Sequence, residues 1–291
     1  MPLCYLSLRQ NSYHTGGIST LNAQDTLAIA IETAKGAGDI LMQHFRRPLA
    51  MDAKSDVVDI VTEADHASEK FTVGALTKHF PTHHIVGEEG GGMGAPYDTA
   101  QAFWYVDPLD GTINFANGIP HFCVSLGLTL SQPHDPILGV IYNPNTGECF
   151  TSIKGEGAFL NGERICVGAR TELVQSVLVS GFGYDRRTNP DNNLAQWNAF
   201  MPKVRGIRRF GSAALDLAFV ACGRFDGYWE RGLKAWDAVA GLLLVREAGG
   251  IVTDYHGNPA LSFVPEGRLI AANPTLHSIM HGIINASYRQ D

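Results

Sequence analysis

Two acidic residues and a Gly-Thr pair follow the apolar run Trp104–Val106, in the order Asp107-Pro108-Leu109-Asp110-Gly111-Thr112. The two carboxylates supply anionic oxygens, which are the ligands that Mg²⁺ prefers. The free backbone N–H groups at the start of the helix that we expect after Gly111, together with the Thr112 hydroxyl, suit phosphate oxygens. This segment therefore predicts a site that binds a hard cation and a phosphate group together.

Three further segments place acidic residues beside expected strands or helices: Asp65 in Val-Thr-Glu-Ala-Asp, Glu88 and Glu89 after Val-Gly, and Asp237 after Ala-Trp. Carboxylates crowded together raise one another's pKa unless a cation is present, and Mg²⁺ supplies that charge. Adjacent acids on an extended segment point in opposite directions, so at most one of Glu88 and Glu89 is expected to face the site.

Structural alternatives exist for two of these segments. Asp110 has the position of a helix cap, with Asp107 merely starting a turn. Thr62 and Asp65 have the spacing of a helix capping box. We interpret Asp107 and Asp110 as metal ligands because Glu88 and Asp237 occur in matching contexts.

These four motifs follow one another along the chain at residues 61–65, 86–90, 107–112 and 235–241. With them, the chain resembles the inositol monophosphatase family from about Asn22 to its C-terminus. The resemblance implies an α+β fold, a layered αβαβα sandwich of the sugar-phosphatase type. It further implies a cytoplasmic, lithium-sensitive homodimer that hydrolyses phosphate monoesters with two or three Mg²⁺ ions. Under this resemblance the metal ligands are Glu88, Asp107, the backbone carbonyl of Leu109, Asp110 and Asp237.

The resemblance also assigns catalytic and substrate-binding residues. Asp65 and Thr112 are expected to orient and activate water beside Glu88, and Lys54 matches the lysine of a mobile loop. The expected substrate contacts are Asp110, Gly111, Thr112, Arg208, Gly211, Ser212, Ala213 and Glu230.

Some of these substrate contacts also have independent support or an alternative. The small residues Gly211, Ser212 and Ala213 allow a backbone turn to approach a sugar closely. Strand alternation turns either Arg208 or Arg209 inward, and the family favours Arg208; a surface or interface salt bridge is the alternative. Glu230 is either a strand-end surface charge or, as in the inositol-specific branch, an acceptor for ring hydroxyls.

The predicted function is Mg²⁺-dependent hydrolysis of inositol 1-phosphate. Fructose-1,6-bisphosphatase, histidinol-phosphate phosphatase and nucleotide 3′-phosphatase activities are alternatives within the family. A regulatory partner of the transcription machinery is an alternative from another class. The chain has no Gly-x-Ser-x-Gly or P-loop motif, which argues against a serine hydrolase and a P-loop kinase.

Composition limits the class of protein. The 291 residues carry a formal net charge of −7 without a basic run, so direct nucleic-acid binding is not expected. Five scattered cysteines fit thiols in a reducing cytosol, and no stretch approaches the ~20 apolar residues of a membrane span. Residues 1–20 are predicted to be a disordered extension, and 21–291 one domain with halves of about 21–170 and 171–291.

The elements that must position these residues can be outlined from capping and turn signals. Asn22 is expected to cap a first helix, and a second is predicted over 67–80 with Phe71 and Leu76 inward. Residues 90–94 are glycine-rich and are predicted to be a flexible loop. Asn161-Gly162 predicts a hairpin, and Asn273 with Pro274 predicts the start of the last helix. Helices and strands are mixed along the chain without a strict βα repeat. This order favours a layered α+β fold and argues against a doubly wound sheet.

Overall fold

The computed structural model of the chain describes residues 22–47, 51–54, 60–130, 135–259 and 267–287. The predicted extension over residues 1–20 lies outside these residues. The described helices are α1 (Ala23–His44), α2 (Glu63–His79), α3 (Thr112–Ala116), α4 (Leu194–Phe200), α5 (Ala213–Ala221), α6 (Ala235–Glu247) and α7 (Pro274–Ser287).

The described strands form three sheets. A short pair consists of β1 (Met51–Ala53) and β2 (Ile60–Thr62). The large sheet contains β3 (His83–Gly87), β4 (Gly91–Gly94), β5 (Ala102–Asp110), β6 (Cys123–Thr129), β7 (Pro136–Asn143), β8 (Glu148–Ile153), β9 (Gly157–Leu160) and β10 (Glu163–Ile165). The small sheet contains β11 (Val177–Ser180), β12 (Gly206–Arg208), β13 (Gly227–Glu230), β14 (Ile251–Thr253) and β15 (Leu269–Ala272).

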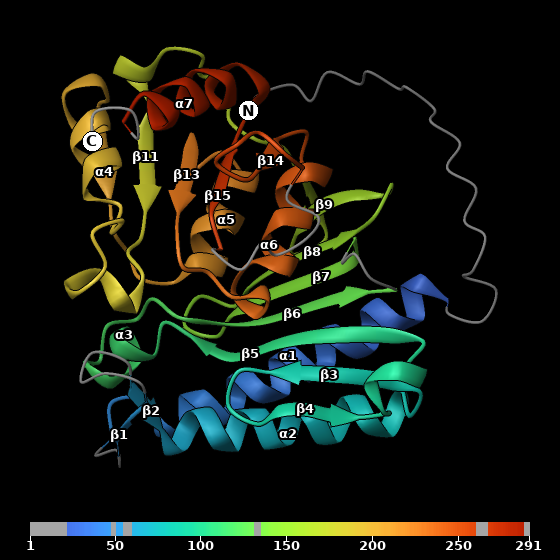
Figure 1. Cartoon of the computed structure of the whole chain (residues 1–291). Helices are drawn as coiled ribbons and strands as arrows, with labels where there is room; N and C mark the ends of the chain where they lie inside the picture. The colour runs from blue at the N-terminus through green and yellow to red at the C-terminus, as the bar shows by residue number, and fades with distance from the viewer. Residues whose placement is uncertain (1–21, 48–50, 55–59, 131–134, 260–266, 288–291) are drawn as a thin grey trace.

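These elements stack in five layers (Figure 1). Helices α1 and α2 cover the outer face of the large sheet, α5 and α6 lie between the two sheets, and α4 and α7 cover the outer face of the small sheet. The predicted α+β fold with αβαβα layering is therefore confirmed. Helices α5 and α6 are apolar on nearly every side because both of their faces are covered by a sheet.

The large sheet has the order β10-β9-β8-β7-β6-β5-β3-β4, in which only β3 and β5 pair in parallel. The pairing of β5 with β6 shifts register between Asp107 and Asp110, which are opposite Ser125 and Cys123. This bulge lies in the Asp-Pro-Leu-Asp segment, and bulges of this kind redirect side chains at a strand end. The sheet thus continues into the acidic segment, where the sequence had suggested that the strand ended.

The small sheet has the order β12-β11-β13-β15-β14. Strands β12, β11 and β13 are parallel, so their carboxyl ends meet at one edge of the sheet. Ser180 at the end of β11 pairs with Trp229, next to Glu230 at the end of β13. The large sheet uses residues 83–165 and the small sheet residues 177–272; the division into halves of about 21–170 and 171–291 stays a prediction.

The caps of the helices follow the sequence signals. Asn22 accepts a hydrogen bond from the backbone N–H of Gln24 at the start of α1. Asn273 caps α7 by accepting hydrogen bonds from the backbone N–H groups of Thr275 and Leu276. The Asn161-Gly162 turn joins β9 to β10, and both residues have positive φ (49° and 83°), as the predicted hairpin requires.

Two expectations about local structure were wrong. Helix α2 begins at Glu63, four residues before the predicted start, because Thr62 and Asp65 form a complete capping box. The Phe71 side chain does not face inward: it lies over Gly36 of α1 and remains 41% exposed, whereas Leu76 is buried as predicted.

The glycine-rich segment 90–94 was also predicted wrongly. Its residues 91–94 form strand β4 at the edge of the large sheet, paired antiparallel with β3. Pairing with a neighbouring strand supplies the backbone hydrogen bonds that a local sequence signal does not reveal.

Close packing of α6 on the large sheet fixes its N-terminus, which carries Asp237. A Cβ atom on Gly127 of β6 would lie 2.5 Å from Cγ1 of Val239, so only glycine permits this approach. Within the described residues, no helix combines the length and the apolar character needed to cross a membrane.

Candidate active site

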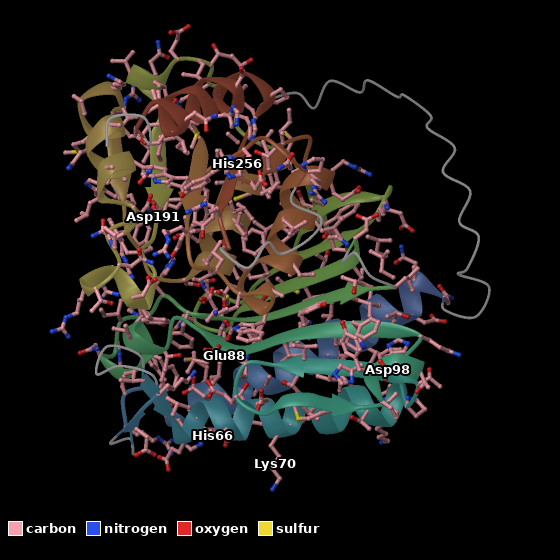
Figure 2. The ribbon with its side chains drawn as sticks, in the orientation of Figure 1. His66, Lys70, Glu88, Asp98, Asp191 and His256 are labelled. Atoms are coloured by element: carbon pink, nitrogen blue, oxygen red, sulfur yellow. The ribbon has the colours of Figure 1, made fainter. Side chains whose placement is uncertain are left out.

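One pocket collects most of the residues that the sequence had singled out. It lies between the ends of β3, β5, β13 and the N-termini of α3, α5 and α6, and it encloses about 230 Å³. The predicted residues that line it are Lys54, Glu88, Asp107, Leu109, Asp110, Gly111, Thr112, Gly211, Ser212, Ala213, Glu230 and Asp237. Figure 2 shows Glu88 at the end of β3, beside the layer that contains α6.

The bulge in β5 holds Asp107 and Asp110 on the pocket side of the strand. One carboxylate oxygen of Asp107 accepts a hydrogen bond from the backbone N–H of Leu109 at 3.0 Å. The residue is only 2% exposed. Burial raises the pKa of Asp107 well above its usual value, and repulsion from Glu88, Asp110 and Asp237 raises it further.

Asp110 binds the start of α5, where the small residues of the Gly-Ser-Ala turn lie. Its Oδ2 accepts hydrogen bonds from the Ser212 hydroxyl at 2.7 Å and from the Ala214 backbone N–H at 2.7 Å. Burial raises the pKa of Asp110 to about 6 even though these donors act in the opposite direction. Asp110 thus joins the strand that carries the first acidic pair to the helix that borders the other end of the pocket.

Asp237 is the third residue of α6 and faces the same pocket. Its Oδ2 accepts a hydrogen bond from the backbone N–H of Lys234 at 2.7 Å, which fixes the helix start. Burial raises the pKa of Asp237 well above its usual value, with repulsion from Glu88 and Asp110 adding to the shift.

Glu88 is paired with Lys54, the residue that directly follows β1. The Lys54 ammonium donates to Glu88 at 2.8 Å and also contacts Glu89. Burial lowers the pKa of Lys54, but the two carboxylates outweigh it and the net shift is upward. Glu88 lines the pocket and Glu89 does not, although both reach the same lysine.

A chain of hydrogen bonds runs from the pocket into the protein through Thr112. The Thr112 hydroxyl lies 3.0 Å from Oδ1 of Asp65 and 3.1 Å from the Leu109 carbonyl oxygen. Oδ2 of Asp65 accepts from the backbone N–H and the hydroxyl of Thr62. Asp65 therefore both caps α2 and holds Thr112, so the capping interpretation and the site interpretation apply together.

The opposite end of the pocket is bordered by Glu230 and the turn before α5. The Tyr228 hydroxyl donates to Oε2 of Glu230 at 2.7 Å, and burial raises the pKa of Glu230 to about 7. Arg209 lines this end, whereas Arg208 is exposed and donates to the Ile207 carbonyl. The predicted substrate contact Arg208 therefore lies outside the pocket, because the short strand β12 ends at Arg208 and the chain turns there.

The donor set of the pocket fits a hard divalent cation. Of the five carboxylates that line the pocket, Glu88, Asp107, Asp110 and Asp237 belong to the predicted metal site, and repulsion among these four contributes to the raised pKa values of Asp107 and Asp237. Among the described residues, no three His, Cys, Asp or Glu side chains are close enough together to bind one metal ion in their present conformations. Each of these four carboxylates accepts a hydrogen bond from a donor of the protein.

Several pocket residues were not found from the sequence. Gly181, Phe182, Gly183 and Tyr184, which follow β11, form one wall. Tyr228, two residues before Glu230 on the same strand β13, donates its hydroxyl to Glu230 from outside the pocket lining. These residues carry no motif, and only the parallel pairing of β11 with β13 brings the segment after Ser180 next to Glu230.

Comparison with known proteins supports this description. Residues 22–290 match the model of the inositol monophosphatase family. The chain is 41% identical over 253 residues to "Nus factor SuhB" of Pseudomonas aeruginosa, covering 86% of this chain and 92% of that protein. It is also 41% identical over 260 residues to "Inositol-1-monophosphatase" of Synechocystis, covering 89% of this chain and 88% of that one. Among solved structures, inositol monophosphatase from Anabaena superposes with a TM-score of 0.82 at 43% identity, covering 91% of this chain and 97% of that chain.

Proposed function

The chain belongs to the inositol monophosphatase family, and from this premise we propose that it is a Mg²⁺-dependent phosphatase that hydrolyses inositol 1-phosphate to inositol and phosphate. The observation that carries the proposal is the single pocket that joins four carboxylates, the Gly-Thr start of α3 and the buried Glu230. The relative named "Inositol-1-monophosphatase" supports the choice of substrate.

Glu88, Asp107, Asp110, Asp237 and the Leu109 carbonyl would hold the magnesium ions. A bound ion would supply positive charge beside the phosphate and lower the pKa of a water molecule toward neutrality. Lys54, which contacts both Glu88 and Glu89, would compete with a metal ion for the Glu88 carboxylate.

Thr112 and Asp65 would position the attacking water. The Thr112 hydroxyl lies between two acceptors, Asp65 and the Leu109 carbonyl, so its single proton is donated to one of them and its lone pairs remain available. A hydroxyl held in this way can accept a hydrogen bond from water and align it for attack on phosphorus. The backbone N–H groups of Gly111 and Thr112 would hold phosphate oxygens.

Glu230 would accept hydrogen bonds from the hydroxyl groups of the leaving alcohol. Its Oε2 is already bound by Tyr228, which fixes the direction of the other oxygen. A carboxylate in this position favours a polyhydroxyl leaving group and disfavours one with a second phosphate. Inositol 1-phosphate is therefore a better fit than fructose 1,6-bisphosphate.

A substrate panel tests the proposal. Purified full-length protein is assayed for phosphate release from inositol 1-phosphate, fructose 1,6-bisphosphate, histidinol phosphate and adenosine 3′,5′-bisphosphate, with Mg²⁺ and with EDTA. We expect the highest kcat/KM for inositol 1-phosphate and no turnover in EDTA. Preference for the fructose bisphosphate would retain the phosphatase class but reject the inositol assignment.

A second function is favoured by a different observation. The relative at 41% identity over 92% of its length is named "Nus factor SuhB", so a role beside the transcription machinery is a candidate for this chain as well. Asp107→Asn separates the two roles. Loss of hydrolysis with unchanged capture of purified RNA polymerase and Nus factors would show that this chain has both.

Other properties stay predictions from the family. They are the homodimer, the cytoplasmic location, the number of magnesium ions and inhibition by lithium. Inhibition by Li⁺ is expected to be uncompetitive with substrate, because Li⁺ would replace one Mg²⁺ after hydrolysis and retain phosphate. Sedimentation of the purified protein and initial rates over a Li⁺ series measure two of them directly.

A further inference from the structure

The pocket has a wall whose residues belong to no recognised motif. We define the wall segment as residues 181–193, which run from the end of β11 to the start of α4. Its first four residues line the pocket, and Gly181 lies against Glu230. A Cβ atom on Gly181 would lie 2.1 Å from the Glu230 carboxylate oxygens, so the backbone of the wall segment is packed directly against Glu230.

An ion pair connects the wall segment to the chain that follows Glu230. Asp185 comes directly after the pocket residue Tyr184, and Arg231 comes directly after Glu230. The Arg231 guanidinium donates to both oxygens of Asp185, at 2.8 and 3.0 Å. Neither residue lines the pocket, so the pair fixes the distance between Tyr184 and Glu230 from outside.

This pair belongs to a larger network. Arg231 Nε lies 3.6 Å from Asp191 of the same wall segment, and Arg268 before β15 also binds Asp191. The Arg231 side chain is 10% exposed, and bidentate pairs of this kind have a defined geometry as well as an attraction. Figure 2 shows Asp191 above the level of Glu88, in the half of the molecule built on the small sheet.

The far end of the wall segment is held by hydrogen bonds between uncharged groups. The Asn193 amide donates to the Ser180 hydroxyl at 2.9 Å and to the Gly181 carbonyl at 2.6 Å, and its oxygen accepts from Trp229 Nε1 at 2.8 Å. Asn193 is buried and has a φ of +70°, a conformation that asparagine tolerates better than most residues. Because Asn193 fixes the far end, the Asp185–Arg231 pair determines the positions of Phe182 and Tyr184 in the pocket wall.

We propose that the Asp185–Arg231 ion pair is a positioning element that determines specificity for the leaving group, because it holds the wall segment against a large polyhydroxyl alcohol. This inference rests on the proposed phosphatase function. A small leaving group that does not reach the wall gains nothing from the pair. If the wall binds the leaving group equally strongly in the ground state and in the transition state, loss of the pair raises KM and leaves kcat unchanged.

The test compares two substrates on matched variants. Asp185→Asn keeps the shape and removes the charge, and it should raise KM for inositol 1-phosphate about 5- to 20-fold, the range for one lost hydrogen-bonded contact. KM for glycerol 2-phosphate and both kcat values should stay within about twofold. Asp185→Glu should restore part of the loss. Because Arg231 also contacts Asp191, Arg231→Met combined with Asp185→Asn should be no worse than Arg231→Met alone.

Glu148→Gln is the control, because it removes another bidentate pair, with Arg224, outside the pocket. It should change neither KM. In a parallel readout without substrate, hydrogen exchange over residues 181–193 should be faster in Asp185→Asn than in wild type and unchanged in Glu148→Gln.

The outcomes distinguish the two proposals. If wild type releases phosphate but Asp185→Asn affects both substrates equally, or leaves exchange over 181–193 unchanged, the positioning role is rejected and the phosphatase survives. A KM change fully explained by an altered oligomeric state in sedimentation also rejects it. If wild type hydrolyses neither substrate, the phosphatase proposal fails, and with it any role of the pair in leaving-group specificity.

Discussion

At the scale of single residues, the pocket is dominated by closely spaced carboxylates. Glu88, Asp107, Asp110 and Asp237 are each turned toward a donor of the protein itself. Divalent cations must therefore compete with Lys54, a hydroxyl and several backbone N–H groups for the same oxygens. The competition predicts that single substitutions at these positions act on metal binding first and on turnover as a consequence.

Asp107→Asn keeps the shape of the side chain and removes one negative charge from the centre of the group. We expect kcat/KM at fixed Mg²⁺ to fall at least about 100-fold, the scale for one lost electrostatic contact in an active site. The rise in Tm that Mg²⁺ causes in wild type should also shrink. Asp98→Asn, an exposed acid outside the pocket, is the control for both measurements. Hydrolysis by Asp107→Asn at the wild-type rate would contradict the metal-ligand role.

Thr112→Ala removes the hydroxyl between Asp65 and the Leu109 carbonyl. Groups that orient or activate water contribute typically ~10²–10⁴-fold, so kcat should fall far more than KM rises. Thr112→Ser keeps the hydroxyl and should retain most of the rate. Steady-state kinetics on the three proteins decides the role: an effect on KM alone would assign Thr112 to phosphate binding.

Glu230→Gln keeps one acceptor and removes the charge. For inositol 1-phosphate we expect a loss of roughly 1–3 kcal/mol in transition-state binding, the scale for a hydrogen bond to a charged group. Glycerol 2-phosphate should be spared, because its leaving group presents fewer hydroxyls to Glu230. Ratios of kcat/KM for the two substrates measure this difference, and an equal loss for both would make Glu230 a structural residue.

At the scale of elements, helix caps differ in how many groups they satisfy. Asn273 caps α7 and also donates to the carbonyls of Gly168 and Arg170, whereas the exposed Asn22 makes one capping bond at α1. The loss of a cap costs about 0.5–2 kcal/mol. Asn273→Ala should lie at or above the top of that range, and Asn22→Ala near the bottom. Urea titrations of both variants test the order, and equal costs would contradict it.

At the scale of the whole molecule, the raised carboxyl pKa values link stability to pH. Asp110 titrates at about 6 and Glu230 at about 7 in the folded protein, against 3.8 and 4.5 as ordinary values. Between about pH 4 and 7 the folded protein therefore binds protons that the unfolded chain has released. The carboxyl groups whose pKa values burial raises, among them Asp107, Asp110, Glu230 and Asp237, lower the stability of the metal-free protein as pH rises through this window. His121 and His277, whose pKa values burial lowers to about 4, act in the opposite direction, but these carboxyl groups outnumber them.

Thermal unfolding in EDTA should accordingly give a lower Tm at pH 7.5 than at pH 5. Mg²⁺ should raise Tm more at pH 7.5, because protons no longer compete for the carboxylates. Asp110→Asn should weaken both the pH dependence and the effect of Mg²⁺. If Asp110→Asn leaves the pH dependence of Tm in EDTA unchanged, Asp110 is ionised without cost in the folded state.

Much of the site was predictable because its chemistry is local. The Asp107–Thr112 segment places two acids, a turn and a helix start within six residues, so its potential to bind metal and phosphate does not depend on any distant contact. Helix caps at Asn22 and Asn273 and the Asn161 hairpin were predictable for the same reason: each rests on hydrogen bonds or φ angles of neighbouring residues.

Only the tertiary structure decided the features that depend on pairing between distant strands. Segment 91–94 became a strand because β3 supplied its partners, and the sequence contained no local signal for that. Arg209 lines the pocket and Arg208 does not, because β12 pairs with β11 only as far as Arg208. Strand alternation alone does not predict which of the two arginines faces the pocket. The wall segment lies against Glu230 because β11 and β13 pair in parallel. A sequence specifies which groups can bond, but pairing across long distances along the chain decides which groups meet.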